Sequence, residues 1–320
     1  MMTTSRKPVF FTTALLIALT ASLIVLPALA AEKTFVMVPK AVHPYYEPCY
    51  EGFKAAGEKY GITVEFEAPQ QQQLEMQVRV IEDLIARGVD GIALSALDDA
   101  GLVTVIDEAL AAGVKVLTFD AEAPSTKALS YIGTNNGAAG YQAGKMMAEL
   151  MGGSGKIALL QATFGAVNLN RRTEEFKRAM AELAPDIEIV AVEEYHGDHA
   201  QAVSKIETLL ETYPDIKAFF GISANGAPAA ATVLKEQGKV GQILAAGFDD
   251  LKDTLDGVRD GRIAFCLVQK TFKMGWLSVE NLLDATDGKE IPKNIDTGML
   301  VVNKDNVDTY MADMKKEFTE

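Results

Sequence analysis

Short apolar runs alternate along this chain with longer segments whose apolar residues recur at helical spacing. The runs are TFVMV (34–38), ITVEFEA (62–68), GIALS (91–95), VKVLTF (114–119), KIALLQ (156–161), IEIVAVE (187–193), IKAFFGI (216–222), QILAAGF (242–248) and IAFCLV (263–268). Between them, 74–87 and 199–213 place Leu, Ile and Val on one helical face. Such alternation predicts parallel β-sheets with helices on both faces. The almost wholly apolar composition of the runs is typical of strands that are covered on both sides.

These apolar runs are too many for one compact sheet. The polar stretch Asn135-Asn136-Gly137 falls near the middle of the series, and the chain has 320 residues, which is enough for about two domains. We therefore predict an α/β protein with two successive doubly wound domains.

The first thirty residues differ from this pattern. Arg6 and Lys7 precede an apolar run (9–26), and Ala28-Leu29-Ala30 follows that run. A basic start, an apolar stretch and an A-x-A triplet are typical of a secretory signal peptide. A retained membrane anchor is the alternative, but it needs about 20 apolar residues, and threonine and serine interrupt this run. We expect residues 1–30 to be cleaved off near Ala30, and we expect the mature protein in the periplasm.

The mature chain is expected to be strongly acidic. The formal net charge is −14, and it becomes −16 without the first thirty residues, whose charged side chains are Arg6 and Lys7. An acidic protein repels phosphate backbones, so we expect no nucleic-acid partner. A small molecule or another protein is the expected kind of partner.

Cys49 and Cys266 are the cysteines of the chain. In an oxidising compartment they could form one disulfide, but the sequence does not show whether their Cα atoms come close enough. Two buried free thiols are the alternative that we favour.

Ligands of open parallel sheets bind beyond the carboxyl ends of the strands. In this chain, planar polar groups and aromatic rings follow most of the apolar runs at those ends. They are Lys40, His43, Tyr45 and Tyr46 after the first run, then Asp120, Phe164, Asn168, Asn170, Arg172, Glu194, Tyr195, His196, Ser223, Asn225, Asp249 and Gln269. Carboxylates, amides and guanidinium groups match adjacent hydroxyls, and aromatic faces cover the C–H patches of a sugar. The set predicts a recognition site for a sugar or polyol.

The same set contains no nucleophile beside a base and no cluster of metal ligands. His196, Asp198 and His199 are loosely spaced, so we interpret them as a surface loop in which Asp198 caps a helix. We therefore expect no catalytic residues, no metal and no cofactor. An exported carbohydrate enzyme that used Asp120 and Asp249 as an acid–base pair is a less favoured alternative.

Several of these residues also have structural interpretations. Tyr45 and Tyr46 would otherwise pack a loop on the core, Asp120 would cap a turn, and Asp249 would cap the helix that follows it. We favour ligand contacts, because each aspartate ends an apolar run on the binding side. For Arg172 the sequence leaves two roles open, a ligand contact and an ion pair with a carboxylate of the cleft.

A series of longer segments has an order and spacing that point to one family. The segments are HPYYEPCYEGFKAAGEKYG (43–61), IEDLIARGVDGIALSALD (81–98), VKVLTFDAEA (114–123), YIGTNNGAAGYQAG (131–144), NRRTEEFKRAM (170–180), YPDIKAFFGISANGAPAAA (213–231), AAGFDD (245–250) and CLVQ (266–269). Together they resemble the periplasmic sugar-binding proteins of the ribose/galactose type, which share their fold with the ligand domains of LacI-type repressors. The resemblance covers essentially the whole mature chain.

The resemblance implies the type I periplasmic-binding-protein fold, in which two Rossmann-like domains joined by three crossovers close around a ligand. The crossovers would fall near Thr134, Gln269 and Thr297. The expected parts of the chain are a signal peptide (1–30), an N-terminal lobe (31–134 plus 270–297) and a C-terminal lobe (135–269 plus 298–320).

Carried over by position, the resemblance also implies roles for single residues. Tyr45 and Tyr46 would stack on the sugar, and Asp120, Asp249 and Gln269 would bind its hydroxyls. The full set of expected ligand-binding residues is Lys40, Tyr45, Tyr46, Asp120, Asn170, Arg172, Ser223, Asn225, Asp249 and Gln269.

The chain departs from the ribose type at several of these positions. Ala121 stands where an arginine often follows the aspartate, and Asn170 stands where a second arginine is usual. Ser223-Ala224 replaces an Asn-Asp pair and leaves Asn225 as its substitute. These changes argue against a ribose-like pose of the ligand.

The segments VPK (38–40) and EAPQQQ (67–72) are closer to the branch that binds rhamnose-type sugars or the furanose autoinducer-2, in which a lysine after the first strand contacts the ligand. We expect a monomeric solute-binding protein of an ABC transporter that delivers a monosaccharide or related polyol to permease subunits in the inner membrane. A sensory binding protein for autoinducer-2 or chemotaxis is the alternative. A transcriptional regulator is disfavoured, because the signal peptide occupies the place of a DNA-binding headpiece.

Overall fold

The computed structural model describes residues 1–5 and 33–317 of the chain. Residues 33–317 belong to one compact unit, while most of the predicted signal peptide lies outside the described residues. Among the residues described, no helix is long and apolar enough to cross a membrane. The fold of 33–317 is built on two six-stranded sheets.

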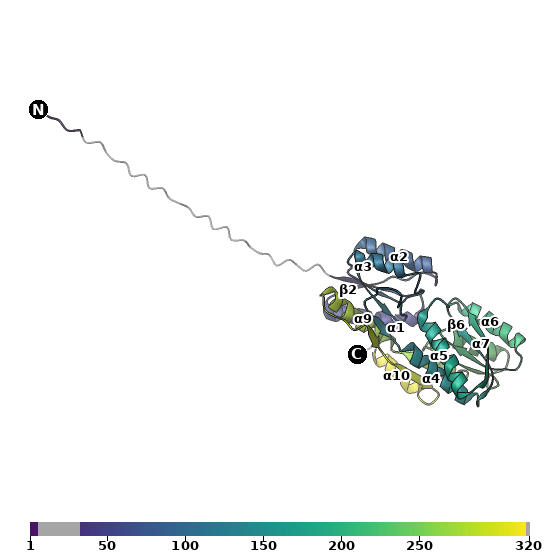
Figure 1. Cartoon of the computed structure of the whole chain (residues 1–320). Helices are drawn as coiled ribbons and strands as arrows, with labels where there is room; N and C mark the ends of the chain where they lie inside the picture. The colour runs from purple at the N-terminus through teal and green to yellow at the C-terminus, as the bar shows by residue number, and fades with distance from the viewer. Residues whose placement is uncertain (6–32, 318–320) are drawn as a thin grey trace. The chain divides into compact units, whose positions relative to one another are not determined.

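The first sheet has the strand order β11-β5-β4-β3-β1-β2, and all its recorded pairings are parallel. Its strands are β1 (Thr34–Val38), β2 (Thr63–Phe66), β3 (Gly91–Leu94), β4 (Lys115–Phe119), β5 (Tyr131–Gly133) and β11 (Asn294–Asp296). Its helices are η1 (Pro44–Tyr46), α1 (Glu47–Tyr60), α2 (Leu74–Arg87), α3 (Val103–Ala111) and α9 (Thr271–Thr286). Figure 1 shows α2 and α3 on one face of the sheet and α1 and α9 on the other.

Burial along β1 explains this layering. Val36 and Val38 pack with the apolar residues of α2 and α3, whereas Phe35 and Met37 pack with those of α1 and α9. Successive side chains of a strand point to opposite faces, so a strand that is apolar throughout needs a helical cover on both sides. The predicted strand–helix alternation is confirmed here.

The second sheet repeats the order as β12-β10-β9-β8-β6-β7. Its strands are β6 (Ser154–Gln161), β7 (Asp186–Glu194), β8 (Ile216–Gly221), β9 (Leu244–Phe248), β10 (Phe265–Gln269) and β12 (Met299–Asn303). Its helices are α4 (Asn136–Leu150), α5 (Val167–Leu183), α6 (His199–Thr212), α7 (Gly226–Glu236), α8 (Lys252–Asp260) and α10 (Val307–Glu317). In this sheet α4 packs on α5 and α6 packs on α7 (Figure 1).

The second sheet departs from the all-parallel expectation at its edge, because β12 runs antiparallel to β10. The chain leaves this sheet at the end of β10 and returns to it after β11 of the other sheet. It therefore starts β12 beside the residue where β10 ended, with Met299 opposite Gln269. A return at that end produces an antiparallel pair.

The chain passes between the two sheets after β5, after β10 and after β11. We call the first sheet with its helices the first lobe and the second sheet with its helices the second lobe. Cys49 is buried in the core of the first lobe and Cys266 in that of the second, and both thiols are free. The structure therefore has the two free thiols that we favoured and not the disulfide.

Candidate functional site

A cavity lies between the two lobes, at the carboxyl ends of the strands of both sheets. It contains about 480 Å³ of space that protein atoms do not fill, part of which is open solvent. Its wall consists of Lys40, His43, Tyr45, Tyr46, Gln72, Asp120, Ala162, Asn168, Leu169, Arg172, Tyr195, Gly197, Ser223, Ala224, Asn225, Asp249 and Gln269. Most of these side chains are polar or aromatic, as the residues after the apolar runs led us to expect.

The cavity wall contains most of the residues singled out from the sequence. They are Lys40, Tyr45, Tyr46, Asp120, Arg172, Ser223, Asn225, Asp249 and Gln269. Asn170 differs, because it accepts a hydrogen bond from Gln161 Nε2 (2.7 Å) and donates one to the Phe164 carbonyl (2.8 Å). The asparagine of α5 that lines the cavity is Asn168. It stands four residues before Arg172, and residues at this spacing share a helix face, whereas Asn170 lies on another.

Asp120 and Asp249 hold corresponding places in the two lobes. Asp120 follows β4 and Asp249 follows β9, which are matching strands in the two sheet orders. Both have backbone φ angles in the left-handed region, 59° and 71°, where aspartate is among the more tolerated residue types. Asp249 does not cap α8, because the residue at that N-cap is Leu251. Both carboxylates instead line the cavity.

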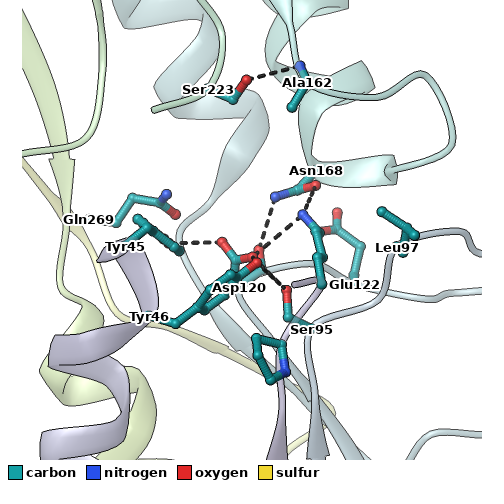
Figure 2. Close-up of polar contacts among 12 residues, drawn as sticks. Tyr45, Tyr46, Ser95, Leu97, Asp120, Glu122, Ala162, Asn168, Ser223 and Gln269 are labelled. Atoms are coloured by element: carbon teal, nitrogen blue, oxygen red, sulfur yellow. Dashed lines mark hydrogen bonds and ion pairs between the residues drawn. The ribbon is translucent and has the colours of Figure 1, made fainter. Parts of the chain in front are cut away.

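Asp120 is surrounded by donors from its own lobe. Tyr45 Oη donates to Asp120 Oδ1 (2.8 Å), and Ser95 Oγ (2.6 Å) and Tyr46 Oη (3.3 Å) donate to Oδ2. Lys40 Nζ lies 3.5 Å from the same Oδ2. Figure 2 shows Tyr45 and Ser95 directed at this carboxylate. We call these five residues the Asp120 cluster.

The charges in the Asp120 cluster compensate one another. Burial favours the neutral form of Asp120, but the charges of Lys40 and Arg172 and the hydrogen bonds from Ser95 and Tyr45 outweigh it, so the pKa of Asp120 is lowered. Burial also lowers the pKa of Lys40. It raises the pKa values of Tyr45 and Tyr46 well above their usual range, which keeps both hydroxyls protonated as donors.

Arg172 is held in the second lobe without an ion pair among the described residues. Its side chain is 1 % exposed. Nε donates to Asn136 Oδ1 (2.8 Å), Nη1 donates to the Ile222 carbonyl (3.2 Å), and the guanidinium lies 4.0 Å from the centre of the Phe248 ring. The remaining nitrogen, Nη2, is buried and has no hydrogen-bond partner in the protein. Of the two roles left open by the sequence, the ion pair is therefore not formed.

Asp249 and Gln269 form the other polar part of the second-lobe wall. Gln269 Nε2 donates to Asp249 Oδ1 (2.9 Å), while Gln269 Oε1 is buried without a partner. Burial raises the pKa of Asp249 to about 7, although Arg172 and the Gln269 hydrogen bond oppose this shift. Asp249 is thus a buried acid that titrates near neutral pH.

Ser223, Asn225 and Tyr195 hold the loops of the second-lobe wall together. Ser223 Oγ accepts a hydrogen bond from the Ala162 amide (3.0 Å; Figure 2). The same oxygen lies 2.7 Å from Tyr195 Oη. Asn225 Nδ2 donates to the Gly197 carbonyl (2.9 Å). The hydroxyl of Ser223 is therefore largely used by the protein itself.

The two lobes contact each other directly beside the cavity. Lys40 Nζ donates to Asn168 Oδ1 (3.3 Å), and Asn168 Nδ2 donates to the Asp120 carbonyl (3.3 Å). Arg171 Nη1 lies 3.0 Å from Glu122 Oε1. Arg171 and Arg172 are neighbours on α5, yet Arg171 reaches the first lobe while Arg172 lines the cavity. These contacts join the two lobes across the edge of the cavity.

Replacing Glu122 by glutamine is expected to weaken ligand binding about 1.5- to 5-fold, because an ion pair with an exposed partner such as Arg171 contributes about 0.2–1 kcal/mol and this pair joins the two lobes that we expect to separate when the ligand leaves. Glu182→Gln is the matched control, since Glu182 pairs with Arg178 at 3.0 Å within α5. Calorimetric titration measures both variants. Equal affinities of the two variants would contradict a role for the Glu122–Arg171 pair in closure.

Within 33–317 and the first five residues, no three histidine, cysteine, aspartate or glutamate side chains come together as metal ligands would. The wall offers donors, acceptors and aromatic rings instead. Tyr45 and Tyr46 meet edge to face, with ring centres 5.0 Å apart and planes 81° apart, so they present different faces to a ligand. The arrangement suits a small molecule that carries several hydroxyl groups.

Comparison with known proteins identifies the family. A family model for the periplasmic binding protein domain matches residues 34–290. The ribose import binding protein of Bacillus subtilis is 27% identical over 79% of this chain and 81% of its own. A Burkholderia graminis ABC transporter solute binding protein, solved in complex with D-arabinose, is 39% identical with a TM-score of 0.84, covering 87% of this chain and 97% of the other. A glucose-galactose binding protein from Geobacillus stearothermophilus is 32% identical with a TM-score of 0.82, and the match covers 86% of this chain and 98% of that protein. The chain belongs to the periplasmic binding protein family.

Proposed function

We propose that this protein is the solute-binding component of an ABC importer and binds a monosaccharide or related polyol between its lobes. The observation that carries this proposal is that three residues of the cavity wall each have a buried polar atom without a hydrogen-bond partner: Gln72 Oε1, Arg172 Nη2 and Gln269 Oε1. A buried polar atom without a partner costs about 1–3 kcal/mol. A ligand hydroxyl, which both donates and accepts, would satisfy any of these atoms.

The ligands of the relatives support a sugar in particular. The Burkholderia graminis protein was solved with D-arabinose, and an Agrobacterium vitis solute binding protein, 25% identical with a TM-score of 0.83, was solved with α-D-tagatopyranose. The curated relatives include ribose and xylose/arabinose-binding proteins. The cavity of this chain offers tyrosine rings on one side and Arg172, Asp249 and Gln269 on the other, which is a suitable chemistry for a polyhydroxylated ring.

Membership of the family implies that the protein acts outside the cytoplasm. We propose in addition that residues 1–30 are a cleaved signal peptide and that the mature protein is a monomer. We propose lobe boundaries at 31–134 plus 270–297 and at 135–269 plus 298–320, which the passages of the chain after β5, β10 and β11 support.

The proposed cycle is a hinge motion. The ligand enters when the lobes are apart, and contacts to both lobes then stabilise the closed form, because only the closed form makes both sets. The closed form delivers the sugar to the permease subunits. The contacts of Lys40 with Asn168 and of Glu122 with Arg171 add to this preference for closure.

A thermal-shift panel on refolded, ligand-free protein tests the function. The panel contains pentoses, hexoses, deoxysugars, polyols, autoinducer-2 and amino acids. A ligand at about 100 times its Kd adds about 2.7 kcal/mol, which moves the midpoint by a few degrees. We expect a shift with one carbohydrate class, retained in the surface variant Asp215→Asn. A panel in which autoinducer-2 or an amino acid alone shifts the midpoint would argue against a monosaccharide ligand.

Sugar affinity is expected to rise as the pH increases from about 6 to 8. The pKa of Asp249 is about 7 in the ligand-free cavity, and a sugar hydroxyl that donates to the ionised carboxylate lowers it. Binding then releases a proton, so affinity grows as the pH rises through 7 and levels off above it. Titration calorimetry across this range measures the effect, and Asp249→Asn is expected to flatten it. An affinity that falls with rising pH would contradict the acceptor role of Asp249.

A further inference from the structure

The first passage of the chain between the lobes, after β5, leads directly to a buried carboxamide that contacts both lobes. Asn136 is the first residue of α4 and is buried. Its Oδ1 accepts a hydrogen bond from Arg172 Nε (2.8 Å) in the second lobe. Its Nδ2 donates to Tyr131 Oη (3.0 Å) and to Glu122 Oε2 (3.3 Å), which belong to the first lobe. One side chain therefore connects the arginine of the cavity with the first lobe.

The orientation of this carboxamide follows from the chemistry of its partners. A guanidinium group only donates hydrogen bonds, and an ionised carboxylate only accepts them. The oxygen of Asn136 must therefore face Arg172, and its amide nitrogen must face Glu122. A carboxylate at position 136 would still accept from Arg172, but it would oppose the charge of Glu122. An amide is the side-chain group that suits both partners.

Tyr131 holds the carboxamide at the passage itself. Its hydroxyl accepts from Asn136 and shares its own proton between the carbonyls of Thr134 (3.0 Å) and Asp120 (3.1 Å). Burial raises the pKa of Tyr131 well above its usual range, which keeps the hydroxyl protonated. A Cβ at Gly133 would stand 2.2 Å from Tyr131 Oη. The hydroxyl therefore lies against the backbone where the chain changes lobes.

The backbone of Arg172 is held separately from its side chain. Gly140 lies one turn after Asn136 on α4, and residues at this spacing share a helix face. A Cβ at Gly140 would stand 2.3 Å from the Arg172 carbonyl oxygen and 2.6 Å from its Cα. Helices α4 and α5 are thus in backbone contact at this point. Because the Cα of Arg172 is held against α4, the contact with Asn136 determines the direction of the guanidinium group.

We propose that Asn136 is a positioning residue, which directs the guanidinium group of Arg172 toward the ligand. The first lobe completes this alignment through Tyr131 and Glu122. Arg172 lines the cavity and Asn136 does not, so Asn136 acts on the ligand only through the arginine. The guanidinium group is planar and rigid, so holding Nε also sets the direction of Nη2. The inference rests on the proposed function, because it assigns a ligand contact to Arg172.

The first part of the test needs no sugar. Hydrogen exchange of the Arg172 Nε–H is followed by NMR in ligand-free protein, and its signal is identified by its absence from Arg172→Met. We expect Asn136→Ala to speed this exchange about tenfold or more, because the acceptor of the proton is lost. The side chain that caps α4 is that of Asn135, so the start of the helix is kept in Asn136→Ala.

Asn281→Ala is the matched control for this measurement. Asn281 is also a buried asparagine, but its Nδ2 donates to the Leu277 carbonyl (2.8 Å) within α9. We expect this variant to leave the exchange of the Arg172 Nε–H unchanged.

The second part measures the binding of D-arabinose by titration calorimetry. We expect Asn136→Ala to weaken binding about tenfold, because a hydrogen bond to a charged group is lost, and Asn281→Ala to stay within about twofold of wild type. In an Arg172→Met background the loss caused by Asn136→Ala is expected to shrink to about threefold or less, since no guanidinium group is left to direct. A merely structural role of Asn136 would cost the same affinity in both backgrounds.

Two further changes test the part of the first lobe. Tyr131→Phe removes one hydroxyl and is expected to weaken binding about two- to fivefold, with no added effect in Asn136→Ala. Asn136→Asp keeps an acceptor for Arg172 but opposes Glu122, so binding is expected to weaken. Adding Glu122→Gln removes the repulsion and supplies an amide donor from the other side. We expect this double variant to bind within about threefold of Glu122→Gln alone.

The outcomes separate the two proposals. If Asn136→Ala leaves the exchange of the Arg172 Nε–H unchanged, or if its full loss of affinity persists in Arg172→Met, the positioning role is overturned while sugar binding stands. If Asn136→Asp gains nothing from Glu122→Gln, the first lobe takes no part in the alignment, and that half of the inference fails. If no monosaccharide binds the wild-type protein, the proposed function fails, and the exchange measurement still decides whether Asn136 holds Arg172.

Discussion

Replacing Asp249 by glycine is expected to weaken sugar binding about 10- to 150-fold, because a hydrogen bond to a charged group contributes about 1.5–3 kcal/mol. Glycine is the informative substitution, since Asp249 has a φ angle of 71°, which glycine adopts without strain. The carboxylate is thus removed while the turn after β9 is kept. Gln269 Nε2 also loses its acceptor, which adds to the effect.

Titration calorimetry with the sugar found in the thermal-shift panel measures this loss. The control is Asp253→Asn, which changes an exposed carboxylate of α8 in the same lobe. Circular dichroism checks that both variants keep the fold. An Asp249→Gly variant that binds sugar as tightly as the control would remove Asp249 from the site.

Replacing Gly275 by alanine is expected to lower the free energy of unfolding by about 3 kcal/mol or more, the upper end of the usual cost of overpacking. A Cβ at Gly275 would stand 1.8 Å from the Cys49 carbonyl oxygen and 2.8 Å from the Phe53 amide nitrogen. At Gly52, on the facing helix, a Cβ would stand 2.0 Å from the Phe272 carbonyl oxygen. Helices α1 and α9 therefore cross with their backbones in contact, and no side chain can move to make room.

Gly137→Ala is the matched control, because the nearest atom to a Cβ there is Glu175 Cγ at 3.6 Å. Alanine favours a helix over glycine by about 1 kcal/mol, so this variant is expected to be as stable as wild type or slightly more so. Urea unfolding compares the two. Equal stability of both variants would contradict the backbone contact between α1 and α9, which orients the start of α1 beside Tyr46 and the start of α9 beside Gln269.

The apolar runs predicted the fold well, because strands buried on both faces carry a strong apolar signal. Each run corresponds to a strand, and the predicted helix 74–87 corresponds to α2. The strands β5, β11 and β12 were not predicted. β11 is a three-residue edge strand whose ends are exposed, and such a strand has no apolar pattern to reveal it.

The candidate site was predictable as a region, because parallel strands bring their carboxyl ends to one edge. Asn168 lines the cavity and Asn170 does not, because Asn168 shares a helix face with Arg172. The spacing of four residues between Asn168 and Arg172 in the sequence would have indicated this. The state of Asp120 could not be predicted, because its donors Tyr45 and Ser95 come from separate segments. Ser95 was counted as the last residue of an apolar run, whereas the structure places it just after β3.

A crystal structure of the protein grown with saturating D-arabinose tests sugar binding between the lobes most directly. We predict the sugar ring beside Tyr45 and Tyr46, with its hydroxyls hydrogen-bonded to Arg172 Nη2, Gln269 Oε1 and Asp249. A sugar bound elsewhere on the protein, with these three groups making no contact to it, would contradict the proposed site.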